Sequence, residues 1–105
     1  MITVTICRSE NDITGFTVDG HANFKPPGED IVCSAVSVLT QAALLGLAQH
    51  ILIDYSISEG HMECRLPELD EVDKIRAEAI LETMLLGLKN IEKNYPGYVE
   101  VMDDV

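Results

Sequence analysis

Basic residues are scarce in this sequence, and their scarcity narrows the range of partners. Seven Lys and Arg stand against eighteen Asp and Glu among 105 residues, so the formal net charge is −11. A surface this acidic repels phosphate backbones and anionic lipid headgroups, and it attracts basic proteins and peptides. We therefore expect no direct nucleic-acid partner.

Cysteines are few as well, and their spacing is not that of a disulfide framework. There are three of them, an odd number without C-x-x-C spacing, which argues against disulfides and for a reducing compartment. The first twelve residues contain no basic region ahead of an apolar run and no small-residue cleavage site, so no export signal is expected. Together these features predict a cytoplasmic protein.

Several motifs of ligand binding are missing too. No G-x-x-x-x-G-K, G-x-G-x-x-G or G-x-S-x-G pattern occurs, so neither a phosphate cradle nor a serine-hydrolase elbow is supported. His61 and Cys64 have the spacing of a metal-binding pair, but residues three apart on a strand point to opposite faces. We expect no metal and no cofactor.

The longest stretch without a charged residue lies in the middle of the chain. No Lys, Arg, Asp or Glu occurs between Ile31 and Ile53, and the pattern predicts a helix from Asp30 to about His50 that is buried over most of its circumference. A membrane span is the competing interpretation. Six polar residues make this segment too polar to span a membrane: Ser34, Ser37, Thr40, Gln41, Gln49 and His50. We therefore expect no membrane association.

The rest of the chain alternates between strand and helix patterns. Period-two alternation predicts strands over residues 2–7, 13–20, 51–58, 61–66 and 98–102, and helical spacing predicts a second helix from about Asp70 to Asn94. The length suits one domain, residues 1–105. The order ββαββαβ predicts an α/β (α+β) fold: a two-layer sandwich in which a mostly antiparallel sheet carries two helices on one face.

The chemistry is expected where the second strand meets the first helix. Asp30 is a good N-cap and places Cys33 in the first helical turn, where free N–H groups and the helix dipole favour a thiolate. His21 leaves the strand on its polar side, and the loop 22–29 is long enough to bring its imidazole to the helix N-terminus. A Cys/His pair is then geometrically possible, and a catalytic role is one interpretation of it. The alternative is a small buried cysteine beside an exposed histidine.

A polar stripe on the same helix supports the catalytic interpretation. Asp30, Cys33, Ser34, Ser37 and Gln41 share an arc of roughly 100° at 100° per residue. The other two cysteines are expected to be structural. Cys64 shares a strand face with Met62 and Leu66 and points to the core, whereas Cys7 lies in a strand without a basic neighbour in sequence.

These residues also carry a resemblance. Asp19-Gly20-His21-Ala22, then Gly28, then Asp30-Ile31-Val32-Cys33, Ala35-Val36-Ser37 and Leu39-Thr40-Gln41 resemble the signature of the ribosomal-processing cysteine protease family Prp, earlier known as the YsxB-like proteins. The likeness extends over essentially the whole chain. Members of that family remove a short N-terminal extension from the large-subunit ribosomal protein L twenty-seven, and they are homodimers.

The resemblance implies a role for each matching position. Cys33 would be the nucleophile and His21 the general base, with Gly20, Asp30 and Ser37 at the supporting positions. Asp30 would cap the helix or orient the imidazole, and Ser37 would hydrogen-bond a partner in the site. The implied substrate is a basic ribosomal protein with an N-terminal extension. Two other classes remain open: a non-catalytic dimeric ribosome-associated binding module and another thiol acyl-transfer enzyme.

The loop between base and nucleophile is expected to cover the site. Pro26-Pro27 limits its mobility, so motion should concentrate at Ala22, Asn23 and Gly28, and Gly28→Val should lower kcat/KM more than stability. The oxyanion donor is either the Cys33 amide or, if Asp30 caps that amide, the amides of this loop.

Overall fold

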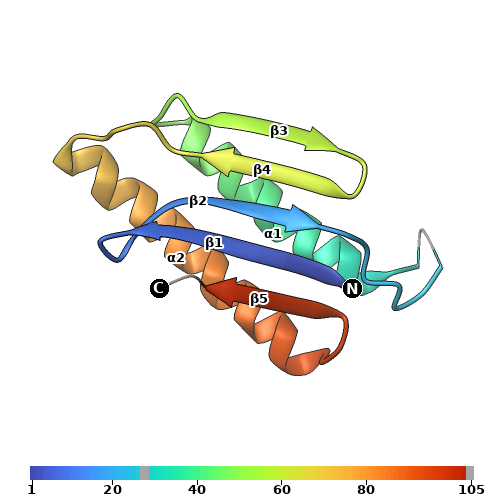
Figure 1. Cartoon of the computed structure of the whole chain (residues 1–105). Helices are drawn as coiled ribbons and strands as arrows, with labels where there is room; N and C mark the ends of the chain where they lie inside the picture. Colours follow the sequence, from blue (N-terminus) through green and yellow to red (C-terminus); the bar gives the residue numbers. More distant parts are fainter. Residues whose placement is uncertain (27–28, 104–105) are drawn as a thin grey trace.

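A computed structural model describes residues 1–26 and 29–103, and it shows a five-stranded sheet with both helices on one face (Figure 1). The expected order ββαββαβ and the α+β class are confirmed. The elements are β1 (Ile2–Ser9), β2 (Asp12–Asp19), α1 (Ile31–Ala48), β3 (Asp54–Ser58), β4 (His61–Arg65), α2 (Glu71–Asn94) and β5 (Val99–Asp103).

The sheet is mixed, with one parallel pair among antiparallel ones. The strand order is β3-β4-β2-β1-β5, and among the described residues only β1 and β5 run parallel. Val4 in the interior strand β1 faces Val18 of β2 on one side and Val101 of β5 on the other. Because β4 pairs with β2, the second hairpin lies beside the end of β2 that leads into the loop before α1.

The core lies between the sheet and the two helices. Alternate residues of β1 point inward, and Ile2, Val4 and Ile6 are at most 3% exposed, as the period-two pattern predicts. They pack in one buried cluster with Leu47 of α1 and Leu81 of α2. Burial of one such side chain contributes about 1.5–3 kcal/mol, so this layer holds α1 firmly against the sheet.

The first hairpin has a shorter turn than the polar run 8–12 suggests. Its turn is Glu10-Asn11, where both residues have positive φ (53° and 74°), a conformation that suits a two-residue hairpin loop. The register shifts between Cys7 and Arg8. This bulge lets both Ile13 and Phe16 face the core, although they stand an odd number of positions apart.

The third strand begins three residues after the expected start. Residues 49–51 still close the helix, since the N–H groups of Gln49, His50 and Ile51 donate to carbonyls of Gly46 or Leu47. Strand pairing therefore starts only at Asp54. All five residues of β3 are exposed because β3 is an edge strand.

The expectation that α1 is buried over most of its circumference is wrong for a single chain. Its inner side is buried, but Ile31, Val38 and Leu45 on other sides are 56%, 69% and 70% exposed. By length and composition α1 could also cross a membrane, a test that the core helix of a globular protein passes equally. Here it packs against the sheet and α2, and its outer surface is apolar.

Candidate active site

Asp30 fixes the start of α1 and ties the preceding loop to it. Its Oδ1 accepts hydrogen bonds from the backbone N–H groups of Val32 (3.0 Å) and Cys33 (2.9 Å), and its Oδ2 accepts one from Phe24 N–H (3.0 Å). These bonds, the one from Cys33 foremost, hold the pKa of Asp30 below its ordinary value. Of the two roles expected for Asp30, the structure shows the capping role.

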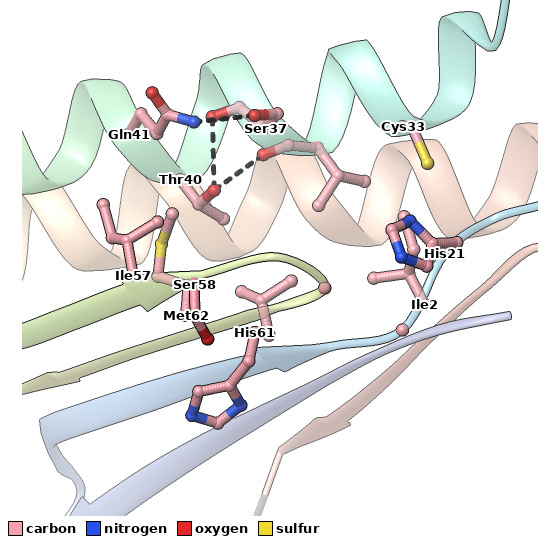
Figure 2. Close-up of a pocket in the computed structure, with 14 residues that line it drawn as sticks. Ile2, His21, Cys33, Ser37, Thr40, Gln41, Ile57, Ser58, His61 and Met62 are labelled. Atoms are coloured by element: carbon pink, nitrogen blue, oxygen red, sulfur yellow. Dashed lines mark hydrogen bonds between the residues drawn. The ribbon is translucent and has the colours of Figure 1, made fainter. Parts of the chain in front are cut away.

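Cys33 and His21 line the same cavity. The Sγ of Cys33 accepts a hydrogen bond from the backbone N–H of Ala22 at 3.3 Å, so the residue after His21 touches the thiol. Figure 2 shows the sulfur of half-buried Cys33 pointing toward the imidazole of His21. The cavity that both side chains line has a volume of about 210 Å³. The structure thus brings the two predicted residues together.

Gly20 makes the turn between β2 and this site. Its φ is +94°, and a Cβ there would lie 2.4 Å from the carbonyl oxygen of Met1, so only glycine fits. Ala22 is buried, with 3% exposure, whereas Asn23 is exposed and has a positive φ of 57°. Gly28 lies outside the described residues, as does Pro27.

The polar stripe of α1 forms one wall of the cavity. Ser37 lies one turn after Cys33 on the same face, and its Oγ accepts a hydrogen bond from Nε2 of Gln41 at 2.8 Å (Figure 2). The Oγ of Thr40 donates to the carbonyl of Val36 at 2.9 Å. The hydroxyl of Ser37 is therefore held by Gln41 in the same cavity wall as Cys33, and it uses its oxygen, not its proton, in the bond to Gln41.

The opposite wall comes from the β3–β4 hairpin, which sequence reasoning did not place in the site. Ile57, Ser58, Gly60 and Met62 line the cavity from this side. The sequence signal was the Glu59-Gly60 turn, which predicts a hairpin but not its neighbour in the sheet. Only the pairing of β4 with β2 brings that turn next to His21.

The other two cysteines stand apart from this cavity. Cys64 is 1% exposed, and burial raises the pKa of its thiol to about 11, which keeps it neutral. Cys7 is exposed on β1. His61 points away from the helices, whereas Cys64 faces the core, so the two do not converge (Figure 2).

A thiol at the first turn of a helix, with an imidazole in the same cavity, is the constellation of a thiol hydrolase. Comparison with known proteins specifies the class further. The family model described as cysteine protease Prp matches residues 1–100. The chain therefore belongs to this family, and it is a cysteine protease.

Relatives with names and structures agree with this membership. The ribosomal processing cysteine protease Prp of Bacillus subtilis is 31% identical over 111 residues, covering 100% of this chain and 99% of the relative. The crystal structure of the essential ribosomal processing protease Prp from Staphylococcus aureus with a covalently linked product peptide has a TM-score of 0.89 at 28% identity, covering 99% and 100%. The same protease with a substrate peptide has a TM-score of 0.82 at 28% identity, with the same coverage.

Proposed function

We propose that this protein is the endopeptidase that removes the short N-terminal extension of ribosomal protein L twenty-seven during ribosome assembly. The observation that carries the proposal is the Cys33 thiol, held by the Ala22 N–H in a cavity that His21 shares. Family membership supports the reaction, and relatives named as ribosomal processing proteases support the substrate. The net charge of −11 complements a basic ribosomal protein.

The proposed reaction is acyl transfer through Cys33. Its thiolate attacks the scissile carbonyl carbon, and the imidazolium of His21 gives its proton to the leaving amine as the C–N bond breaks. His21, now neutral, takes a proton from water as that water attacks the thioester; the C–S bond breaks, the acid leaves, and the Cys33 thiolate and the imidazolium of His21 are restored. No cofactor enters these steps.

The oxyanion donor in this proposal comes from the loop. The Cys33 N–H already donates to Asp30 Oδ1 at 2.9 Å, so it is not available to the substrate. Ala22 N–H lies 3.3 Å from Sγ, and the carbonyl oxygen of an attacked substrate lies next to that sulfur. Once the sulfur has bonded to the carbonyl carbon it no longer carries the negative charge, so we assign the Ala22 N–H to the oxyanion that forms beside it, with the Ser37 hydroxyl as the second donor on the α1 side.

A second copy of the chain is the proposed cover for the outer surface of α1. Val38 and Leu45 are 69% and 70% exposed there, and such apolar surface is ordinarily buried in a partner. The homodimer implied by the sequence resemblance would bury it. We also propose a cytoplasmic location, since three free cysteines suit a reducing compartment and the proposed substrate is assembled there.

The deciding experiment is incubation with the extended ribosomal protein from the same cell, read by mass spectrometry. We expect one cleavage near its N-terminus, complete loss in Cys33→Ala and no loss in Cys7→Ala. If the peptide stays intact while an added p-nitrophenyl ester acylates Cys33 and releases p-nitrophenol, the protein would instead be the other thiol acyl-transfer enzyme. Intact substrate with no acylation would contradict the proposed function.

A further inference from the structure

The imidazole of His21 rests against a residue that has no side chain. Gly60 lies in the turn between β3 and β4, and a Cβ built there would be 3.0 Å from Nε2 of His21 and 3.7 Å from both Cδ2 and Cε1. The distance of 3.0 Å to Nε2 is shorter than an ordinary van der Waals contact. The ring therefore occupies space that any other residue at position 60 would take.

Two links tie this turn to the residues just before His21. The N–H of Gly20 donates to the carbonyl of Gly60 at 2.9 Å. One position away in the ladder Asp19 faces His61, and the Nδ1 of His61 lies 2.5 Å from Oδ1 of Asp19. Figure 2 shows the ring of His61 pointing away from the helices, and His61 also belongs to the residues that line the cavity.

We propose that the β3–β4 turn is a positioning element for the general base: Gly60 sets the place of the His21 imidazole, and the Asp19–His61 pair holds Gly60 against it. The inference rests on the proposed roles of His21 and Cys33. It adds a residue of the cavity wall that acts through the His21 imidazole.

The physical reason is the sensitivity of proton transfer to distance. Chain connectivity already places Ala22 N–H on Sγ of Cys33, but the side chain of exposed His21 is free to rotate unless something limits it. The β3–β4 turn borders the ring on the hairpin side, and the missing side chain of Gly60 leaves the ring its place there. A side chain at position 60 would push the ring by a few tenths of an ångström or into another rotamer, and displacements of that order slow proton transfer sharply.

The test compares two glycines with similar backbones. Gly60 and Gly97 have φ of +70° and +89°, but a Cβ at Gly97 meets nothing within 4 Å. Ala at either position adds similar backbone strain, and Asn adds less because it tolerates positive φ. The variants Gly60→Ala, Gly60→Asn, Gly97→Ala and Gly97→Asn separate strain from displacement of the ring.

Three quantities are measured: kcat and KM on an extension peptide, the pH profile of iodoacetamide alkylation of Cys33 in a Cys7→Ala background, and thermal unfolding. We expect both Gly60 variants to lose about tenfold or more in kcat with KM nearly unchanged and with an altered alkylation profile. Both Gly97 variants should match the wild type in kcat, KM and the alkylation profile, and only their thermal unfolding should differ. Asp19→Asn, which adds no strain, should lose less kcat than Gly60→Asn.

His21→Ala is the reference that keeps this inference apart from the proposed function. If His21→Ala changes neither cleavage nor alkylation, the proposed base is wrong. If His21→Ala abolishes cleavage while folded Gly60→Asn cleaves at the wild-type rate, the base stands and the positioning role is overturned. Equal losses in the Gly60 and Gly97 variants would overturn it as well, because strain alone would then explain both.

Discussion

The backbone N–H of Ala22 donates a hydrogen bond to the Sγ of Cys33, with 3.3 Å between nitrogen and sulfur. One bond from a loop amide thus joins the end of β2 to the first turn of α1. It places His21, the residue before Ala22, next to the thiol through the chain itself.

Removal of the thiol should stop the reaction and leave the fold intact. Cys33→Ala should show no cleavage and nearly unchanged unfolding, since Ala is well suited to a helix. Cys64→Ala is the contrasting variant. Cys64 is 1% exposed, so its loss should lower stability by about 1–2 kcal/mol and preserve activity. Peptide cleavage beside denaturant unfolding measures both, and cleavage by Cys33→Ala at the wild-type rate would exclude Cys33 as the nucleophile.

Removal of the imidazole should have two effects. His21→Ala should lower kcat by about 10²- to 10⁴-fold, because it removes both proton-transfer steps. It should also slow alkylation of Cys33 at neutral pH, since the ion-pair partner of the thiolate is gone. His50→Ala is the control, as His50 lies at the far end of α1 and does not line the cavity. Unchanged alkylation in His21→Ala would mean that the two side chains do not interact.

The places of Cys33 and His21 in the fold could be predicted because they follow from short-range patterns in the sequence. Asp30 is an N-cap by residue type, and that cap alone puts Cys33 in the first turn. The period-two pattern of residues 2–7 likewise gave the buried side of β1. Such signals depend on neighbours three or four positions away, which the sequence displays directly.

The rest of the site depends on contacts between distant segments. Gly60 and His21 are brought together by the pairing of β4 with β2, and no local pattern encodes which strands are neighbours. The edge position of β3 also results from which strands pair, and no local pattern shows it. Alternation puts Tyr55 and Ile57 on one face of their strand, and both are exposed, 58% and 53%, because the helix layer of one chain does not cover them. The expectation for Gly28 stays a prediction, since that residue lies outside the described ones.

Asp30 should matter for activity beyond its role as a helix cap. In Asp30→Asn the Oδ1 acceptor for Val32 and Cys33 is kept, but a side-chain NH₂ then faces the N–H of Phe24, so the loop loses its bond to the helix. We expect lower kcat/KM. The matched control is Asp70→Asn, because Asp70 caps α2 through Asp73 N–H and lies away from the cavity.

The same carboxylate gives a pH dependence. The pKa of Asp30 is lowered in the folded state, chiefly by the hydrogen bond from Cys33 N–H. Its stabilising effect is therefore complete above the ordinary value of 3.8 and is lost as pH falls through the lowered pKa. Thermal unfolding between pH 6 and pH 2 should show a steeper decline for the wild type than for Asp30→Asn. Parallel curves for the two proteins would contradict this.

The outer surface of α1 should determine assembly. Val38→Lys and Leu45→Lys place a charge on the apolar surface that we assign to a second copy, and each should shift the protein from dimer to monomer in sedimentation. Met102→Lys is the control, since Met102 is 49% exposed on β5 and lies in a different part of the molecule. A wild-type monomer of 11.5 kDa at micromolar concentration would exclude the dimer.

The first part of the loop should act as a fixed wall of the site. Ala22 is buried and bonded to the thiol, and Phe24 donates its N–H to Asp30. The ring of Phe24 also packs edge-on against Tyr95 and Tyr98, with centroids 5.5 Å and 5.0 Å apart. These contacts disfavour a hinge at Ala22 and Asn23 and make Phe24 the anchor of the segment.

Phe24→Ala should therefore lower stability by about 2 kcal/mol and reduce kcat/KM at temperatures where the variant is fully folded, because the wall beside Cys33 loses its anchor. Pro26→Ala, two residues further on and exposed, is the matched control and should change activity only modestly. Hydrogen exchange of the Ala22 and Phe24 amides gives the direct measurement, and both should exchange faster in Phe24→Ala alone. Equal protection and equal kcat/KM in the wild type and Phe24→Ala would mean that the aromatic contacts do not hold this segment, and that the hydrogen bonds to Cys33 and Asp30 are sufficient.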